Sequence, residues 1–537
     1  MKALSQNTWH LVRKLHSAPS FWTSLFGEQS KASLFEGIAS AGEPLVIPHI
    51  MDFLLAEEKE VREAAANTIG HLITFVKPEE YARLDEECRP EWYQSGGELR
   101  WHSLAPPRVE DFRALPYGTI MIGLASFHKS GFVRQAAVNE LSKISDGLEL
   151  PFLLVRLNDW VDPVRESAAK AVLQRAGYDY GNHFYRNLPL VMRLDSCQRI
   201  KDDGIQQSVR RLLQTPASAS IVKAGLNSTD RWLRRQSAQI ILTGTVSPDM
   251  DLLRLLLTNR DPIVRLWAAR RLPLICGGIM LTQVLAKLGR DRFAPIRREV
   301  LDLMARENNA TTVIENALLD SNASVRDIAR YWIKKLRPDY DFRERYRQWL
   351  DSSPVCTRVA IFGLAESGTV EDVERVVPFL ASDNVSWKRA AVYALAQLNG
   401  KRFTEQFLNA LADENPGISK EARFALARMD DLPVERLQTM FKAQSSPHVR
   451  KNVFHLLGSQ SFWNRGVFFF EALRDHDDRI VQLGANALRG WIRKSGNMGT
   501  APTPSDLRQL QDSLKASAGL LSPHDAEELQ FALQAYQ

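Results

Sequence analysis

Four positions along the chain pair a basic side chain with an aromatic ring four residues later. The basic residues are Arg358, Arg389, Lys420 and Lys451, and the rings are Phe362, Tyr393, Phe424 and His455. Residues four apart share one face of a helix, so each cation is expected beside its ring. Such a surface can bind a phosphate backbone with stacked bases, bind an acidic peptide, or pack between neighbouring helices. We call these eight residues the basic-aromatic stripe.

A second column of charge precedes the basic position of the stripe by one residue. It contains arginines at Arg62, Arg134, Arg165, Arg265, Arg326 and Arg450. Each follows an aliphatic position, and several trail an aspartate, namely Asp162, Asp261 and Asp320. A column of arginines can bind successive phosphates or can form ion pairs inside a fold, and the column alone leaves both interpretations open.

Motifs for catalysis are missing from the sequence. It has no P-loop, no HExxH, no GxSxG and no glycine-rich dinucleotide fingerprint. The cysteines Cys88, Cys197, Cys276 and Cys356 are widely spaced and form no CxxC pair, so we expect buried thiols in a reducing compartment. We expect no metal and no cofactor.

The residues that position both columns recur with a period near 31. The clearest copy is Asp159 to Gly177, in which Val164, Ala168 and Val172 share one helix face and Gly177 can end the helix. Positions equivalent to Arg165 lie at Lys31, Arg62, Arg134, Arg234, Arg265, Arg297, Arg326, Thr357, Lys388, Ser419, Arg450 and Val481.

Two further columns describe how these helices pack. Three residues after the arginine position the residue is small, at Ala65, Ala137, Ala168, Ala268, Ala329, Ala360, Ala391 and Ala422. Seven residues after it the residue is aliphatic, at Ile69, Leu141, Val172, Ile241, Leu272, Ile333, Leu364, Leu395, Leu426, Leu457 and Leu488. A unit of two short helices cannot bury its own apolar face, so neighbouring units must stack into an α-solenoid.

These residues carry a family resemblance. Asp162-Pro163-Val164-Arg165 with Ala168, Val172 and Gly177, and the variant Asp261 to Arg265 with Ala268 and Leu272, resemble the short HEAT repeat of the phycobilisome-lyase HEAT-like type. The resemblance covers most of residues 25 to 495. It implies an all-α, right-handed α-solenoid of HEAT-like helical hairpins. It also implies that the stripe lies on the second helix of each unit, on the concave surface, and that the arginines form a structural ladder with loop carboxylates.

The resemblance says little about activity, because repeats of this family occur in scaffolds, chromophore lyases, a metal-dependent hydroxylase and, more distantly, DNA glycosylases. The His-Glu dipeptides of the hydroxylase branch are missing. Asp327 near Tyr331 and Trp332 is the one loose match to a glycosylase site, and no chromophore-specific feature supports a lyase. We therefore expect no enzyme, with a HEAT-like lyase or DNA glycosylase as the alternative.

The repeats are expected to form one elongated domain between two caps. Residues 1–24 suit an N-terminal cap helix, residues 25–494 the solenoid, residues 495–505 a Gly/Pro/Thr linker, and residues 506–537 two C-terminal cap helices.

The period breaks at two insertions. Residues 85–116, with Trp92, Tyr93 and Trp101, form either a partner site or a loop that folds back on the solenoid. Residues 178–204, with Phe184 and Tyr185, form either a second contact region or an irregular repeat.

Composition excludes several classes of protein. Of 537 residues 45% are hydrophobic, and no run approaches the roughly 20 apolar residues that cross a bilayer. The first residues lack a signal-peptide pattern, so we expect a cytoplasmic location and no membrane contact. A formal net charge of +6 is modest for this length and does not by itself indicate nucleic acid.

The functional hypothesis therefore rests on the basic-aromatic stripe. The equivalent basic position holds Asp327 one period earlier and Gln482 one period later, and in the N-terminal half it holds Glu63 and Glu166. We expect a non-catalytic scaffold or adaptor that presents residues 326–460 to a protein partner, with an acidic surface on that partner as one option. The alternative is a nucleic-acid binder that uses the same stripe. The sequence leaves the partner and the oligomeric state open.

Overall fold

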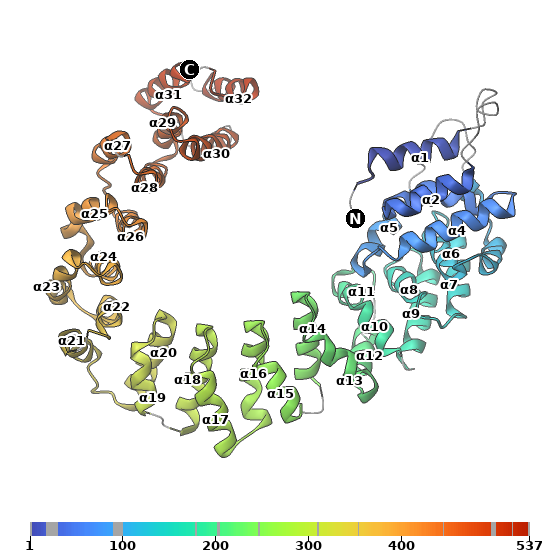
Figure 1. Cartoon of the computed structure of the whole chain (residues 1–537), viewed down its shortest axis with the longest axis horizontal. Coiled ribbons are helices and arrows are strands. Elements are labelled where there is room, and N and C mark those ends of the chain that lie inside the picture. The colour runs from blue at the N-terminus through green and yellow to red at the C-terminus, as the bar shows by residue number, and fades with distance from the viewer. Residues whose placement is uncertain are drawn as a thin grey trace. The chain divides into compact units, whose positions relative to one another are not determined.

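The computed structural model describes residues 3–17, 30–89, 100–177, 180–200, 204–244, 248–308, 311–352, 354–443, 445–495, 501–517 and 519–534. Within these ranges every regular element is an α-helix or a 3₁₀ helix (Figure 1). None of the described helices is both long and apolar enough to cross a bilayer. The chain divides into two compact units, unit 1 (Met1–Gly277) and unit 2 (Gly278–Gln537), where the sequence predicted one domain.

The α-helices of unit 1 are α1 (Gln6–His16), α2 (Lys31–Ala41), α3 (Ile47–Ile50), α4 (Lys59–Ile73), α5 (Tyr81–Glu87), α6 (Gly118–Ala125), α7 (Gly131–Ser142), α8 (Leu150–Arg156), α9 (Asp162–Ala176), α10 (Gly181–Arg186), α11 (Leu188–Arg193), α12 (Gly204–Leu213), α13 (Pro216–Gly225), α14 (Arg231–Leu242), α15 (Met250–Leu257) and α16 (Pro262–Ile275).

The α-helices of unit 2 are α17 (Gly278–Leu288), α18 (Ala294–Asn308), α19 (Thr311–Asn316), α20 (Ala323–Leu336), α21 (Phe342–Ser352), α22 (Thr357–Ser367), α23 (Val373–Val376), α24 (Val385–Asn399), α25 (Thr404–Leu411), α26 (Pro416–Leu426), α27 (Val434–Ala443), α28 (Pro447–Leu457), α29 (Phe462–Leu473), α30 (Asp478–Ser495), α31 (Pro504–Ala516) and α32 (Pro523–Gln534).

The predicted repeat is confirmed. Each position equivalent to Arg165 lies at or near the start of a helix, from Lys31 in α2 to Val481 in α30. The small residues of the next column, Ala65, Ala137, Ala168, Ala268, Ala329, Ala360, Ala391 and Ala422, are all 0% exposed. The aliphatic column is likewise buried, with Ile241 partly so. The chain is an all-α solenoid of HEAT-like hairpins, and within each unit adjacent hairpins pack on one another.

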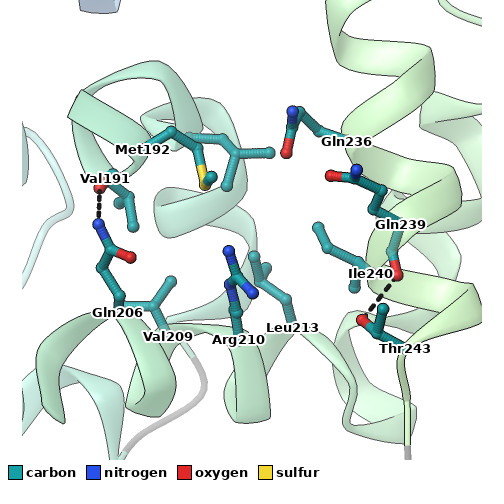
Figure 2. Close-up of a pocket in the computed structure, with 11 residues that line it drawn as sticks. Val191, Met192, Gln206, Val209, Arg210, Leu213, Gln236, Gln239, Ile240 and Thr243 are labelled. Atoms are coloured by element: carbon teal, nitrogen blue, oxygen red, sulfur yellow. Dashed lines mark hydrogen bonds between the residues drawn. The ribbon is translucent and has the colours of Figure 1, made fainter. Parts of the chain in front are cut away.

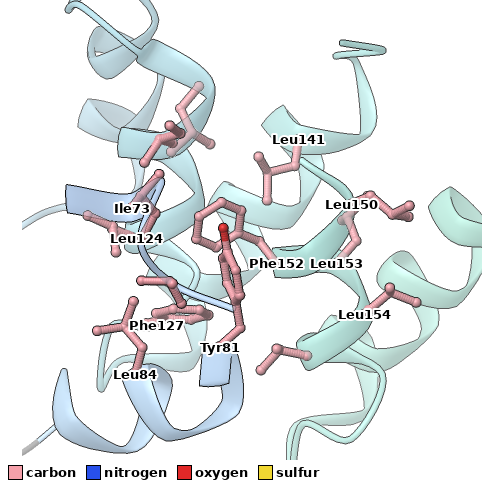
Figure 3. Packing of buried hydrophobic residues seen from close by; sticks show 14 of the residues in the cluster. Ile73, Tyr81, Leu84, Leu124, Phe127, Leu141, Leu150, Phe152, Leu153 and Leu154 are labelled. Atoms are coloured by element: carbon pink, nitrogen blue, oxygen red, sulfur yellow. The ribbon is translucent and has the colours of Figure 1, made fainter. Parts of the chain in front are cut away.

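Each unit contains one large apolar core cluster. In unit 1 it joins residues from Val12 to Ile240, and in unit 2 it joins residues from Leu301 to Leu533. Figure 3 shows part of the core of unit 1, where the Phe152 ring of α8 contacts two other rings. Its centroid lies 5.3 Å from that of Tyr81 and 5.4 Å from that of Phe127. These rings join α5, which leads into the first insertion, to the hairpins that follow it.

The described part of the first insertion folds back on the solenoid. Trp101 is 3% exposed, and its backbone N–H donates to Asp52 Oδ1 at 2.9 Å. Its ring stacks on Phe112 of the 3₁₀ helix Pro106–Ala114 at 5.9 Å between centroids. Trp92 and Tyr93 lie outside the described residues. Residues 100–116 therefore extend the core of unit 1.

The second insertion buries its aromatic residues as well. Phe184 is 0% exposed, and Tyr185 shares a hydrogen bond of 2.6 Å with Ser237 of α14. The hydroxyl of Tyr180 donates to the buried Glu149 at 3.1 Å. These rings anchor an irregular repeat, in which Asn187 is also buried and donates to the His183 carbonyl at 2.9 Å.

Helices also lie at the predicted ends. At the N-terminal side α1 buries Val12 and Leu15, and Phe21 lies outside the described residues. At the C-terminal side α31 and α32 bury Leu510 and Leu529. Helix α30 extends to Ser495 and α31 begins at Pro504, so both helices enter the predicted linker.

Candidate functional site on unit 2

The arginine column binds the backbone of the turn that precedes each helix. Arg62 Nη1 donates to the carbonyls of Ala56 and Glu57 at 2.8 and 2.7 Å. Arg134 Nη1 donates in the same way to His128 and Lys129 at 3.1 and 2.9 Å. Arg165, Arg265 and Arg326 also donate to the carbonyl six residues before them. This backbone contact recurs along the column.

Carboxylates join some of these arginines to the next repeat. Arg134 donates to both oxygens of Asp159 at 2.8 Å, and Arg450 pairs with Asp475 at 2.5 Å. Each aspartate lies 25 residues after its arginine, in the turn of the following hairpin. Arg326 pairs instead with Glu366 of α22.

Two of the three aspartates that precede column arginines bind an arginine of the preceding repeat, whereas Asp162 pairs with Arg165 of its own helix. Asp261 accepts from Arg235 at 2.9 Å, and Asp320 accepts from Arg297 at 2.7 Å. Burial would raise the pKa of Asp320, but hydrogen bonds from Arg297 and the backbone lower it overall. Because Arg134, Arg326 and Arg450 are at most 2% exposed, these arginines are bound inside the fold and cannot line up external phosphates.

The basic-aromatic stripe follows the second helices of four adjacent hairpins in unit 2, namely α22, α24, α26 and α28. In Figure 1, these helices form one row of unit 2, and α21, α23, α25 and α27 form the other. Successive helices of the row pack against each other. The stripe is therefore carried by one layer of helices.

Two of the four predicted cation-ring pairs form directly. The Arg358 guanidinium lies 5.6 Å from the centroid of Phe362, and the Lys420 ammonium lies 5.9 Å from that of Phe424. Arg389 instead points to Glu421 of the next helix, with 3.5 Å between Nη2 and Oε2.

The rings connect one helix to the next. The Phe362 and Tyr393 rings meet edge to face at 5.4 Å between centroids. Tyr393 and Phe424 line one open cavity of about 210 Å³, together with Glu421 and Arg428. The rings of α22 and α24 are therefore in contact, and those of α24 and α26 face one open cavity.

His455 adds a neutral ring at the end of the row. Partial burial and the nearby positive charges of Arg423 and Lys451 lower the pKa of His455 below its ordinary value of 6.5. The imidazole is therefore uncharged at pH 7, and Lys451 supplies the positive charge of this repeat.

Three cations outside the eight predicted stripe residues also lie against its rings, and one of them, Arg326, belongs to the arginine column. Arg326 lies 5.6 Å from the Phe362 centroid, Arg423 lies 4.5 Å from that of Phe424, and Arg428 lies 5.9 Å from that of Tyr393. Each ring is thus held between or beside guanidinium groups, and such contacts typically contribute about 0.5–1 kcal/mol at exposed sites.

Three cations of the stripe face solvent without a carboxylate. Arg358, Lys420 and Lys451 are exposed, and none forms an ion pair with any residue that the structure describes. The carboxylate in the cavity, Glu421, is engaged by Arg389. The stripe thus carries positive charge that the described part of the chain leaves uncompensated.

A second cavity of about 220 Å³ lies in unit 1, between α11, α12 and α14 (Figure 2). Val191 and Ile240 give it apolar walls, and Gln206 donates to the Val191 carbonyl at 3.3 Å. Its lining includes one ionisable side chain, Arg210, so no acid and base converge there.

Other signs of catalysis are also absent from the described ranges. No cluster of three or more His, Cys, Asp or Glu side chains there has the arrangement of a metal site. Asp327, the residue of the glycosylase hypothesis, is largely exposed and lies 3.5 Å from Arg330. The Trp332 indole beside it donates to Asp302 at 2.8 Å. Asp327 is thus a surface residue, and Trp332 is held by a structural hydrogen bond.

Comparison with known proteins finds only solved structures of low similarity to this chain. No family model matches the chain, and no curated protein matches it. A structure of yeast importin-beta is similar at 12% identity over 85% of this chain and 67% of that chain, with a TM-score of 0.33. A chain from a structural study of tubulin recruitment by microtubule polymerases with TOG domain arrays is similar at 13% identity. The match covers 77% of this chain and 99% of that chain, with a TM-score of 0.24. At these scores the backbones do not superpose closely, so the assignment to HEAT-like hairpins rests on the repeat itself.

Proposed function

We propose that this protein is a non-catalytic scaffold whose basic-aromatic stripe binds an acidic segment of a protein partner. One observation carries the proposal: Arg358, Lys420 and Lys451 are exposed, form no ion pairs among the described residues, and lie on the same row of helices as the rings. Complementary charge brings partners together and selects among them, and aromatic residues with arginine supply most hot spots of protein interfaces.

Some rings of the stripe pack between helices, and another is available to a partner. Phe362 and Tyr393 are half-buried and contact each other, so they fix the spacing of α22 and α24. Phe424 is 47% exposed beside the open cavity. We assign Phe424 and the three exposed cations to the partner, with Tyr393 and Arg428 as the walls of a pocket for an apolar side chain.

Nucleic acid is the second candidate, because cations alternate with rings along the row. Base stacking needs an open ring face. The Phe362 ring has guanidinium groups of Arg326 and Arg358 within 5.6 Å and a second ring at its edge. Phe424 alone among the three carbocyclic rings is exposed, which favours the acidic protein segment.

The test is affinity capture from lysate of the source cells with the full chain and the variant R358E/K420E/K451E, each with and without nuclease. The matched control is R479E/K494E/K515E, which reverses three exposed cations elsewhere in unit 2 that form no ion pair with described residues. We expect the stripe variant to lose nuclease-resistant protein partners that the control retains.

Two results contradict the proposal. If recovery of every partner depends on intact nucleic acid, and affinity for a single-stranded oligonucleotide falls steeply with salt, the nucleic-acid function is correct. If the stripe variant folds, as its circular dichroism would show, and retains every partner, the stripe is not the binding site.

We also propose that the repeats are of the short phycobilisome-lyase HEAT-like type, between cap helices at 1–24 and 506–537, in a cytoplasmic protein. The buried alanine column and the Asp-Pro start of α9 support the repeat type. Imaging of a tagged full chain tests the location, since concentration at a membrane or outside the cell contradicts it.

A further inference from the structure

The two insertions meet at one surface pocket of unit 1. This open cavity of about 230 Å³ lies beside Trp160, in the turn between α8 and α9. Asp85, Glu86 and Arg89 come from the start of the first insertion, and Arg193 and Arg199 come from the second. Segments about a hundred residues apart in sequence therefore build one site, which we call the Trp160 pocket.

A network of guanidinium groups and carboxylates forms the floor of the Trp160 pocket. Arg89 donates to both oxygens of Asp85 at 3.1 and 2.8 Å. Arg156 pairs with Asp85 and also with Asp159, the latter at 2.9 Å. Asp159 is in turn bound by Arg134 of the arginine ladder at 2.8 Å. Three guanidinium groups thus share two carboxylates, which leaves an excess positive charge.

Arg156 concentrates this excess inside the protein. Its side chain is 1% exposed, and its Nε has no hydrogen-bond partner among the described residues. A buried cation with an unused donor is costly unless further negative charge or an acceptor approaches it. The floor of the pocket therefore has positive charge and a hydrogen-bond donor that a bound anion could compensate.

Trp160 forms an exposed wall above this network. Its ring is 62% exposed, although tryptophan is highly buried on average. The guanidinium carbons of Arg89 and Arg134 lie 5.3 and 5.5 Å from its centroid, so the ring is held in place by two cation-π contacts. A fixed, exposed indole provides apolar surface for a peptide chain beside the charged pocket.

The rim adds two uncompensated cations. Arg193 and Arg199 are exposed, and neither side chain forms an ion pair with a residue in the described ranges. The backbone N–H of Arg199 donates to Asn158 Oδ1 at 3.3 Å, which holds this segment at the pocket. Glu86 is the remaining acidic group of the lining. Among the described residues in and beneath the pocket, five guanidinium groups face three carboxylates.

We propose that the Trp160 pocket binds a phosphorylated side chain on a segment of a partner protein. A phosphorylated residue carries about −1.5 to −2 charges at pH 7, which matches the excess of two guanidinium groups. Arginine binds phosphate oxygens in pairs, as Arg193 and Arg199 can from the rim. The exposed Trp160 ring then packs against the chain beside the phosphorylated residue.

Other anions fit this pocket less well. An unmodified aspartate or glutamate brings one charge and leaves the network unbalanced. A nucleic-acid backbone needs cations along an extended track, whereas these cations surround one cavity that also contains Glu86. The inference concerns a different unit and different residues from the stripe, so either proposal can fail without the other.

The test measures binding of the full chain to short degenerate peptide pools with a central phosphoserine, serine or glutamate. Inorganic phosphate and a single-stranded oligonucleotide serve as further probes. The variant R193S/R199S removes the rim cations, and R186S/R211S is the matched control, since these two exposed arginines lie nearby but do not line the pocket. W160A tests the wall independently of the rim.

We expect the phosphoserine pool to bind about tenfold or more tightly than the serine and glutamate pools, and R193S/R199S to lose about tenfold of that affinity. W160A should also weaken peptide binding, and R186S/R211S should not. Equal binding of the three pools, or no binding of any pool, overturns the proposal. So does inorganic phosphate that binds as tightly as the phosphoserine pool, or an oligonucleotide whose tighter binding is lost in R193S/R199S.

Discussion

At the residue scale, equivalent arginines of the ladder are expected to contribute differently to the free energy of unfolding. Arg134 is fully buried and bonds both oxygens of Asp159 as well as two backbone carbonyls. Arg62 bonds two carbonyls and forms no ion pair within the described chain. We expect R134M to cost about 3 kcal/mol of unfolding free energy, because it leaves a buried carboxylate short of a partner, and R62M to cost about 1 kcal/mol.

Chemical denaturation of the two variants, followed by circular dichroism, measures this difference. A similar loss in both variants would show that the carbonyl contacts, which both arginines share, supply the stabilisation. In that case the carboxylate of the following repeat would contribute little to the stability of the ladder.

His128 should make stability depend on pH. Its Nδ1 accepts the N–H of Ser130 at 3.0 Å, so the neutral ring is protonated on Nε2, which lies 3.1 Å from the Trp101 carbonyl. Burial and the charges of Lys129 and Arg134 lower the pKa of His128 to about 4. Because the folded pKa lies below the unfolded value of about 6.5, stability is fully present above pH 6.5 and is lost as the pH falls towards 4, by up to about 3 kcal/mol.

Denaturation midpoints at pH 7.5 and 5.0 check this expectation, with H128Q as the comparison. Glutamine keeps a donor and an acceptor but does not titrate. The variant should be less sensitive to pH than the natural chain. Equal sensitivity in both would place the titration on another group.

At the element scale, one glycine sets the distance between the two helices of a hairpin. A Cβ on Gly363 of α22 would lie 2.2 Å from the ring of Tyr346 in α21. Tyr346 is 0% exposed, and its hydroxyl donates to the Leu318 carbonyl at 3.1 Å, so the ring cannot move freely. We expect G363A to cost about 1–3 kcal/mol through overpacking.

Gly490 of α30 provides the control for this substitution. It is exposed, and a Cβ there would meet nothing within 4 Å. G490A should therefore stabilise the helix by up to about 1 kcal/mol, because alanine has the higher helix propensity. Thermal denaturation distinguishes the two variants, and a lower midpoint for both would mean that helix propensity is not the controlling factor at Gly490.

The period in the sequence predicts those features that every hairpin repeats. Burial of Ala360 and Ala391 could be predicted because each hairpin needs the same close approach of helices. The contacts of Arg358 with Phe362 and of Lys420 with Phe424 could be predicted because i and i+4 share a helix face.

Features that occur in a single hairpin cannot be predicted from the period of the sequence. Arg423 packs on Phe424, but the equivalent position holds Ile361, Val392 and Phe454 in neighbouring repeats, so no column indicates a cation. The Trp160 pocket combines Arg89 with Arg193, which belong to two interruptions of the period. The sequence identified both interruptions, but it predicted aromatic residues as their contact residues. Phe184 and Tyr185 are buried, and arginines line the pocket instead.

At the scale of the whole molecule, the two proposed sites lie in different compact units, and within each unit adjacent hairpins pack on one another. The stripe occupies α22 to α28 of unit 2, and the Trp160 pocket occupies unit 1. The stability of repeat arrays is approximately a sum of local terms, and substitutions that share no contact usually add. We therefore expect no energetic coupling between the two sites.

A double-mutant cycle measures this coupling. R193S/R199S, R358E/K420E/K451E and their combination are compared for affinity to the phosphoserine pool and for recovery of the acidic partner. Each set should change only its own ligand, and the combination should equal the sum of the two free-energy changes within about 0.5 kcal/mol. A stripe variant that weakens the phosphopeptide, with its fold intact, would instead show that the two sites are energetically coupled.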